Sequence, residues 1–214
     1  MTLPPRSECV TVYFDYLCPF AWRGAELTHL IAEPLGLHFR WHHFSLYQSN
    51  YSGDDNWQLW NEKIDSQDEY GSKGLLPFLA SCAARKQGDA VHQHFRLQLM
   101  RARHHNHQPF VMETMLEVAK CVGLHLPSFE KELANPECRT ILAQEHHRAK
   151  AHNVFGTPTF HFCNDTQGEH LAYLRIKQLP QDLDEALGLF RNYREMLERY
   201  PYVETIKRPR QQRN

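Results

Sequence analysis

The sequence predicts an α/β fold in which both ends of the chain contribute strands to one sheet. Three observations lead to this prediction. The N-terminal part has a strand–helix–strand pattern, residues 45–153 show no strand pattern, and the C-terminal part has the pattern of a hairpin followed by a helix. Alternating and continuous apolar runs favour strands, whereas apolar residues at helical spacing favour helices. We therefore expect one sheet built by the two ends, with the middle of the chain as a helical insertion.

The bulk properties exclude several classes of protein. The chain has 214 residues, of which 42% are apolar, so that one large domain or two small ones can form a core. The net charge of −1 gives no reason to expect a nucleic-acid partner. No stretch approaches the ~20 apolar residues of a membrane span, and the N-terminal residues MTLPPRSEC contain no apolar signal region. We expect a cytoplasmic protein with no membrane partner, and the sequence leaves its oligomeric state open.

The first strand and helix place a cysteine at a special position. The apolar run 10–14 predicts a strand, and Pro19 suits the first position of a helix, where its missing N–H costs nothing. Cys18 is then expected at the N-cap, where free N–H groups and the helix dipole favour a negative charge. We therefore expect a thiol that ionises more readily than a free cysteine and acts as a nucleophile. Pro34 and Gly36 end this helix, and the alternation over 38–44 predicts a second strand parallel to the first.

The middle of the chain is predicted to be helical. Apolar residues at helical spacing predict helices over 76–86, 90–104 and 111–122, followed by a short helix from Ser128 and another from Pro136 to about Ala151. The C-terminal part then predicts two strands, 159–163 and 170–175, joined by the turn-rich residues 164–168, and an amphipathic helix over 181–200. The remaining tail, 201–214, is basic and is expected to be solvated and frayed.

A second motif is the run 154–160, Val-Phe-Gly-Thr-Pro-Thr-Phe. Together with Cys18-Pro19-Phe20-Ala21 after a strand, it resembles the thioredoxin superfamily, and within it the DsbA-like disulfide oxidoreductases, on the branch of the FrnE-like proteins and hydroxychromene-carboxylate isomerases. Ala21 stands where many members of the family have a second, resolving cysteine. The resemblance implies a thioredoxin fold with an inserted all-helical domain. The thioredoxin-like domain would comprise 9–44 and 154–200, the insertion 45–153, and the basic tail 201–214.

The resemblance also implies roles for individual residues. Pro158 would be a cis-proline whose loop faces Cys18, and Thr157 would offer its backbone to a substrate thiol or to glutathione. The alternative is an ordinary trans Gly-Thr-Pro turn, since cis peptide bonds are uncommon. The catalytic residue would be Cys18, and the substrate-binding residues would be Pro19, Phe20, Thr157 and Pro158. No bound cofactor is implied, although glutathione is a possible cosubstrate.

Three functions are compatible with these motifs. The leading hypothesis is a thiol–disulfide oxidoreductase in which Cys18 forms a mixed disulfide with a protein or with glutathione. Because Ala21 replaces the resolving cysteine, an external thiol would have to release the product. The second hypothesis is a glutathione-dependent isomerase or transferase that resembles the kappa glutathione transferases and hydroxychromene-carboxylate isomerases, which carry serine where this chain has Cys18. The third is a thioredoxin-like binding protein without catalysis.

The remaining candidate groups favour structural roles. His92 and His94 lie two residues apart, so that on a helix their rings point to different sides, and no Cys-x-x-Cys or His-Glu-x-x-His pattern occurs. No metal site is therefore predicted. A basic cluster comprises Arg96, Arg101, Arg103 and His104. It is expected to be a solvated helix face or, alternatively, a site for an anion such as a glutathione carboxylate. The five cysteines other than Cys18 are expected to be structural thiols; the alternative is that one of them is a distant resolving partner of Cys18.

Overall fold

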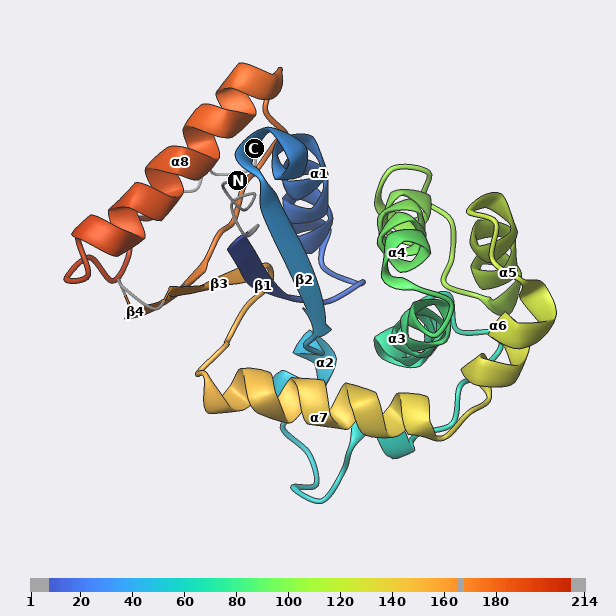
Figure 1. The fold of residues 1–214 in the computed structure, drawn as a ribbon. Coiled ribbons are helices and arrows are strands. Elements are labelled where there is room, and N and C mark those ends of the chain that lie inside the picture. The colour runs from blue at the N-terminus through green and yellow to red at the C-terminus, as the bar shows by residue number, and fades with distance from the viewer. Residues whose placement is uncertain (1–7, 165–167, 209–214) are drawn as a thin grey trace, which may run out of the picture.

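The computed structural model describes residues 8–164 and 168–208, and its centre is one four-stranded sheet (Figure 1). The order of the strands is β2-β1-β3-β4, with β1 parallel to β2 and the other two pairs antiparallel. The bounds of the strands are β1 (Glu8–Phe14), β2 (Leu37–His43), β3 (Thr159–Asn164) and β4 (Gly168–Tyr173). The prediction that both ends of the chain build one sheet is confirmed.

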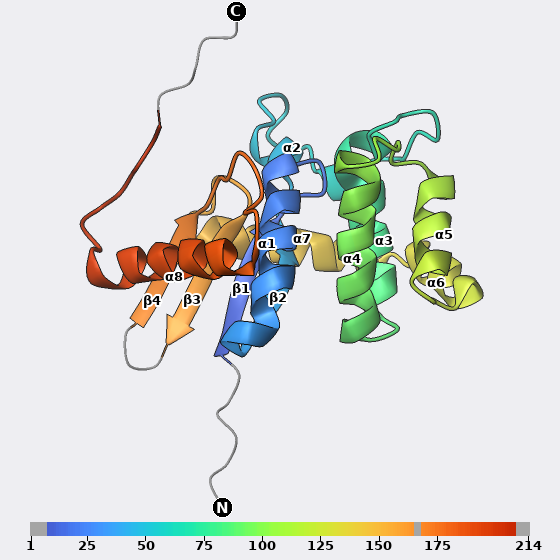
Figure 2. The ribbon, with the colours of Figure 1, turned by 90° about the horizontal axis from the view of Figure 1, so that it is seen from above.

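Helices α1 (Pro19–Leu35) and α8 (Leu183–Arg199) cover one face of this sheet, and α7 (Glu137–Ala151) lies on the other side (Figure 2). Successive side chains of a strand point to opposite faces, which divides the residues of β3 between the two layers. Phe160 of β3 packs against Phe190 of α8, with ring centroids 5.8 Å apart. On the other face, Tyr13 of β1 packs in a small cluster with Ala149 of α7.

Between β2 and β3 the described chain contains helices and no strand, as expected. These elements are α2 (Leu46–Ser49), the 3₁₀ helix η1 (Leu59–Asn61), α3 (Gly71–Arg85), α4 (Asp89–His104), α5 (Met112–Cys121), α6 (Leu126–Leu133) and α7. The assigned range of α3 begins at Gly71, but Ser72, Lys73 and Gly74 have positive φ, so its regular part begins at Leu75, one residue before the predicted start. The helix start predicted at Ser128 is wrong by two residues. Helix α6 begins before Ser128 because Pro127 takes a position in its first turn.

Buried charges tie the helical insertion to the sheet. Both Glu145 oxygens are engaged: Oε2 lies 2.8 Å from Nδ1 of His43, and Oε1 lies 2.6 Å from a guanidinium nitrogen of Arg85. Although burial opposes ionisation, His43 and Arg85 hold the pKa of Glu145 far below its usual range. Glu145 belongs to α7, His43 to β2 and Arg85 to α3, so one carboxylate joins three elements.

The basic cluster on α4 differs from its prediction. Arg96 is buried with its guanidinium 4.2 Å from the ring centroid of Trp41, so the expectation of a solvated face is wrong at this residue. Arg101 makes a bidentate pair with Glu26 of α1, with both distances 2.7 Å. The other two members, His104 and Arg103, contact the backbone oxygen of Tyr16 and the ring of Tyr70. These side chains are thus engaged in contacts within the protein.

The described residues contain no helix long and apolar enough to cross a bilayer. Residues 201–208 of the basic tail are exposed and follow the last helix. The predicted turn 164–168 and the predicted tail extend into 165–167 and 209–214, which lie outside the described residues.

Candidate active site

The turn between β1 and α1 is held by a buried carboxylate. Asp15 is 1% exposed, and its two oxygens accept hydrogen bonds from the backbone N–H groups of Leu17, at 2.8 Å, and Leu46, at 2.7 Å. The backbone N–H of Cys18 donates to the carbonyl of Asp15 at 3.1 Å. This turn places Cys18 directly at the start of α1. The sequence analysis missed Asp15, although an aspartate at the end of a strand is a known signal for such a turn.

Cys18 is the N-cap residue of α1, as predicted. Its backbone is extended, with φ −89° and ψ 113°, and Pro19 follows in the first turn. Its side chain does not cap the helix. The sulfur is therefore available to a group outside the helix.

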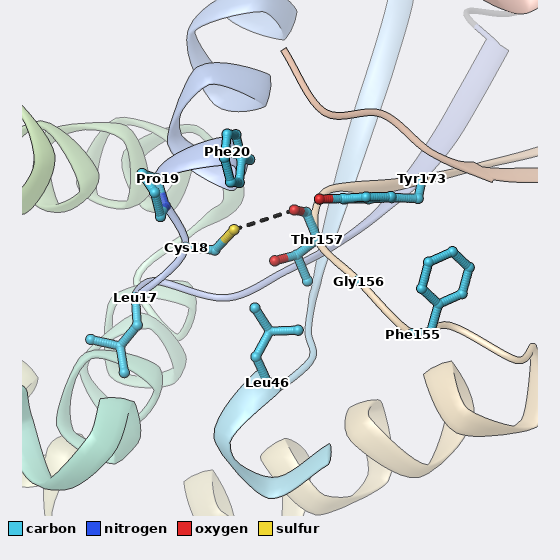
Figure 3. A pocket seen from close by; sticks show the side chains of 9 residues that line it. All are labelled: Leu17, Cys18, Pro19, Phe20, Leu46, Phe155, Gly156, Thr157 and Tyr173. Carbon is cyan, nitrogen blue, oxygen red and sulfur yellow. Dashed lines mark hydrogen bonds between the residues drawn. The ribbon is translucent and has the colours of Figure 1, made fainter. Parts of the chain in front are cut away.

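That group belongs to the proline loop. The Thr157–Pro158 peptide bond is cis, and Sγ of Cys18 donates a hydrogen bond to the backbone oxygen of Thr157 at 3.3 Å (Figure 3). The prediction that this loop lies beside Cys18 is confirmed. The two motifs are 139 positions apart in the sequence, and the antiparallel pairing of β3 with β1 brings them together.

The electrostatics of Cys18 contradict the expectation of an acidic thiol. Burial raises the pKa of Cys18 above its ordinary value, and the negative charge of Asp15 adds to this effect. The hydroxyl of Thr157 and the backbone N–H groups of Phe20 and Ala21 act in the opposite direction but do not compensate. The sequence-based argument considered the helix N-terminus alone, whereas the loss of hydration of a buried thiolate is the larger effect here.

A pocket of about 440 Å³ opens over the sulfur. Its nine lining residues come from the β1–α1 turn, the first turn of α1, α2, the proline loop and the end of β4, and most of them are apolar (Figure 3). Cys18, Pro19, Phe20 and Thr157 are predicted site residues that line it. Pro158 does not line the pocket and packs against Gly24 of α1. The lining residues that sequence reasoning missed are Leu17, Leu46, Phe155, Gly156 and Tyr173.

Aromatic rings mark the pocket walls. Phe155 is 73% exposed and its ring lies 5.7 Å from that of Tyr173. The guanidinium of Arg175 lies 3.8 Å from the ring centroid of Phe20, which also lines the pocket. A molecule that reaches Cys18 therefore meets apolar faces and one nearby cation.

Cys18 is the one thiol among the lining residues. Ala21, where a second cysteine would stand, is fully buried in the first turn of α1. All six cysteines are free; Cys121 and Cys163 are exposed, and Cys82 and Cys138 are buried. Chemically, this arrangement can form a mixed disulfide at Cys18, and it has no neighbouring thiol in the pocket to resolve it.

Comparison with protein families finds one match that covers most of the chain. A family model described as DSBA-like thioredoxin domain matches residues 9–184. A search of curated proteins found no match to the chain.

Several solved structures share the fold. The cytosolic disulfide reductase DsbM from Pseudomonas aeruginosa, solved with GSH, is similar with a TM-score of 0.57 and 19% identity, over 87% of this chain and 99% of that one. A 2-hydroxychromene-2-carboxylate isomerase is similar with a TM-score of 0.61 and 17% identity, over 92% of this chain and 100% of that one. The thiol-disulfide exchange protein alpha-DsbA2 from Wolbachia pipientis has a TM-score of 0.56 and 12% identity, over 91% and 84%. At these identities the similarity establishes the fold.

Proposed function

The chain belongs to the family of DSBA-like thioredoxin domains, and on that premise we propose that it is a thiol–disulfide oxidoreductase that acts through Cys18 alone. The observation that carries the proposal is the contact between Sγ of Cys18 and the backbone oxygen of Thr157, which precedes the cis-proline. A substrate disulfide bound at this point lies within reach of both the nucleophilic sulfur of Cys18 and the backbone of Thr157.

The proposed reaction has two steps. Cys18 first loses its proton to solvent, and the thiolate attacks one sulfur of the substrate disulfide. A new S–S bond forms at Cys18, the old S–S bond breaks, and the leaving thiolate takes up a proton. An external thiolate then attacks the mixed disulfide, which regenerates Cys18 and releases a disulfide that contains the external thiol.

Ala21 supports the need for an external thiol. In a two-cysteine motif, the second thiol lies one turn away and attacks the mixed disulfide from within. Here a buried methyl group occupies that place. Glutathione is the proposed external thiol, because it is the abundant thiol of reducing compartments. This choice agrees with a cytoplasmic location, and the name of the similar DsbM structure refers to both the cytosol and GSH.

The test is the formation and reversal of a mixed disulfide. Incubation of the reduced protein with oxidised glutathione, followed by intact-mass and peptide mass spectrometry, should show one glutathione on Cys18, and reduced glutathione should remove it. The exposed thiols Cys121 and Cys163 are replaced by serine beforehand, because they compete for the reagent. Modification that persists in Cys18→Ser, or is distributed over Cys9 and Cys82, would contradict the proposal.

The raised pKa of Cys18 favours a second candidate, a glutathione-dependent isomerase or transferase. A thiol that stays protonated can donate its S–H to the thiolate of bound glutathione, in the way a serine hydroxyl would. In that case glutathione is the nucleophile and Cys18→Ser retains activity. The oxidoreductase proposal predicts complete loss of activity in Cys18→Ser, so one variant separates the two functions.

A further inference from the structure

A second cluster of reactive side chains lies on the sheet face opposite α1 and α8. It consists of His152, which follows α7, His161 in β3 and Glu169 in β4. His161 alternates with Phe160 and Phe162, which face the core, so it points to the other face. Glu169 pairs with Cys163 of β3 and therefore shares the face of His161. None of the three residues lines the pocket at Cys18.

The three side chains converge on a small volume. Nε2 of His161 lies 2.6 Å from Oε1 of Glu169, and Nδ1 of His152 lies 3.1 Å from the same oxygen. The two imidazole ring centroids are 4.8 Å apart. One donor atom from each residue lies within 4.8 Å of the other two. Around a tetrahedral ion with bonds of ~2.0–2.1 Å, ligand atoms are roughly 3.4 Å apart, so the cluster needs only small side-chain rotations to hold an ion.

We propose that His152, His161 and Glu169 form a binding site for a divalent transition metal of the zinc class. Two imidazoles and one carboxylate are donors that suit Zn²⁺, and three protein ligands leave the fourth tetrahedral position to water. The ion would join the end of α7 to the β3–β4 hairpin. It would be separate from the thiol chemistry at Cys18, so the inference does not depend on the proposed function.

The orientation of the His161 ring is compatible with a metal ligand. Nε2 of His161 is buried and makes no well-aligned hydrogen bond with any described residue, although the oxygen of Glu169 is 2.6 Å away. A metal ion lies on the lone-pair axis of its imidazole ligand, and the neighbouring ligand atom lies beside that axis. Oε1 of Glu169 is close to Nε2 of His161 but off the lone-pair axis of this nitrogen, as expected for a neighbouring ligand atom.

The surroundings hold one ligand firmly and leave another accessible. The ring of Tyr13, itself 1% exposed, is nearly parallel to that of His161, with centroids 6.4 Å apart and an interplanar angle of 18°. Packing of this kind orients a metal ligand. The side chain of Glu169 is 52% exposed, whereas that of His161 is 12% exposed. The exposed carboxylate side provides access for an ion and for its water ligand.

The test is metal binding by the full chain without an affinity tag. Titration with Zn²⁺ in a calorimeter should show one ion per chain, and titration with Co²⁺ should give the visible absorption of a tetrahedral nitrogen–oxygen site. Glu169→Gln, His152→Ala and His161→Ala should each weaken binding at least about tenfold. The first two changes are at partly exposed positions, so they keep the test informative if His161→Ala does not fold.

Two variants serve as matched controls. His38→Ala removes an exposed histidine of β2 that pairs with Cys9 of β1. Cys163→Ser removes the exposed thiol that pairs with Glu169 across the β3–β4 hairpin. Both should bind Zn²⁺ like the unmodified protein. The proposal is overturned if the unmodified protein binds less than one ion, if Glu169→Gln binds as tightly as the unmodified protein, or if the Co²⁺ spectrum contains a sulfur-to-metal charge-transfer band.

Discussion

Gly24 and Pro158 lie so close together that a side chain at position 24 would collide with the proline ring. A Cβ atom built on Gly24 would be 2.7 Å from Cγ of Pro158 and 3.2 Å from its Cβ. Helix α1 therefore approaches the proline loop to a distance that only glycine permits. Since Cys18 begins this helix and Thr157 precedes this proline, the contact sets the distance between the sulfur and its carbonyl partner.

Gly24→Ala is expected to destabilise the protein and to disturb the site. The new methyl group must displace the proline ring, and overpacking of this kind costs about 1–3 kcal/mol. The shift should also separate Cys18 from Thr157 and change the rate at which oxidised glutathione modifies Cys18. Urea unfolding and the rate of adduct formation measure the two effects.

Gly188→Ala is the matched control, because Gly188 also lies within a helix but a Cβ there meets no atom within 4 Å. This change should stabilise the protein by about 0.5–1 kcal/mol through helix propensity and leave the reaction of Cys18 unchanged. Equal effects of the two substitutions on stability would show that the contact with Pro158 is unimportant.

Thr157→Val is expected to change the acidity of the Cys18 thiol without lowering the stability of the protein. The hydroxyl of Thr157 has no hydrogen-bond partner among the described residues while Cys18 is protonated, but it lowers the pKa of Cys18 by favouring the thiolate. Its removal should raise the pKa of Cys18 further, which the pH dependence of alkylation measures. Stability should stay the same or increase by up to about 1–2 kcal/mol, because a buried unpaired group is lost.

The neighbouring Thr159 provides the comparison for this variant. Its hydroxyl donates to the carbonyl of Gly156 at 2.7 Å, so Thr159→Val should cost about 1 kcal/mol and leave the acidity of Cys18 unchanged. A pKa of Cys18 that does not move in Thr157→Val would refute the role of the hydroxyl.

Asp15 is expected to make stability depend on pH. Burial raises the pKa of Asp15 to about 6, above its ordinary value of 3.8, against the two backbone N–H groups that favour ionisation. The folded state thus holds this proton more tightly than the unfolded state, and the resulting stabilisation is complete below pH 3.8 and is lost as pH rises through about 6. Relative to Asp15→Asn, the unmodified protein should lose about 2.4 kcal/mol of unfolding free energy between pH 4 and 7. Unfolding by urea at several pH values gives this difference; a difference that is constant with pH would contradict it.

The same substitution provides a readout at the active site. The charge of Asp15 raises the pKa of Cys18, so Asp15→Asn should lower that pKa. Alkylation of Cys18 as a function of pH measures the shift, and Asp54→Asn, in an exposed loop, serves as the control.

Ala21→Cys is expected to shorten the life of the glutathione adduct. The substitution restores a thiol one turn from Cys18, which can attack the mixed disulfide and expel glutathione thiolate. After removal of excess glutathione, intact-mass spectrometry should show rapid loss of the adduct and formation of an internal disulfide. Ala21→Ser adds a group of similar size without a thiol, and its adduct should persist. Persistence in Ala21→Cys as well would indicate that the first turn of α1 does not bring the two sulfurs together.

Glu145→Gln is expected to be the most destabilising of these substitutions. It leaves Arg85 and His43 without their charged partner, and loss of one member of a buried pair costs about 3–5 kcal/mol. The lowered pKa of Glu145 stabilises the folded state above the carboxylate's ordinary pKa, and that contribution is lost as pH falls below it. The difference in unfolding free energy between the unmodified protein and the variant should therefore diminish toward low pH. Glu137→Gln, which breaks the exposed pair with Lys86, should destabilise the protein far less than Glu145→Gln.

Local patterns in the sequence were sufficient to predict most of the fold. The apolar run before Cys18, the helix start at Pro19 and the helical spacing of residues 76–151 depend on neighbours in the chain, and these neighbours decide backbone conformation. The resemblance carried by Cys18-Pro19 and Gly156-Thr157-Pro158 added the connection between the two ends. The start of α6 was wrong because Pro127 lies in its first turn, and a proline at this position does not follow apolar periodicity.

The sequence by itself predicted that Cys18 stands at a helix start, and the family resemblance added that Ala21 replaces a resolving thiol and that the loop of Thr157 and Pro158 faces Cys18. Only the tertiary structure decided that burial raises the pKa of Cys18, since the hydration of a thiolate depends on every segment that covers it. It also brought together Phe155 and Tyr173 at the pocket, and His152, His161 and Glu169 at the proposed metal site. These groups come from segments joined by the sheet, so no spacing along the chain encodes their proximity.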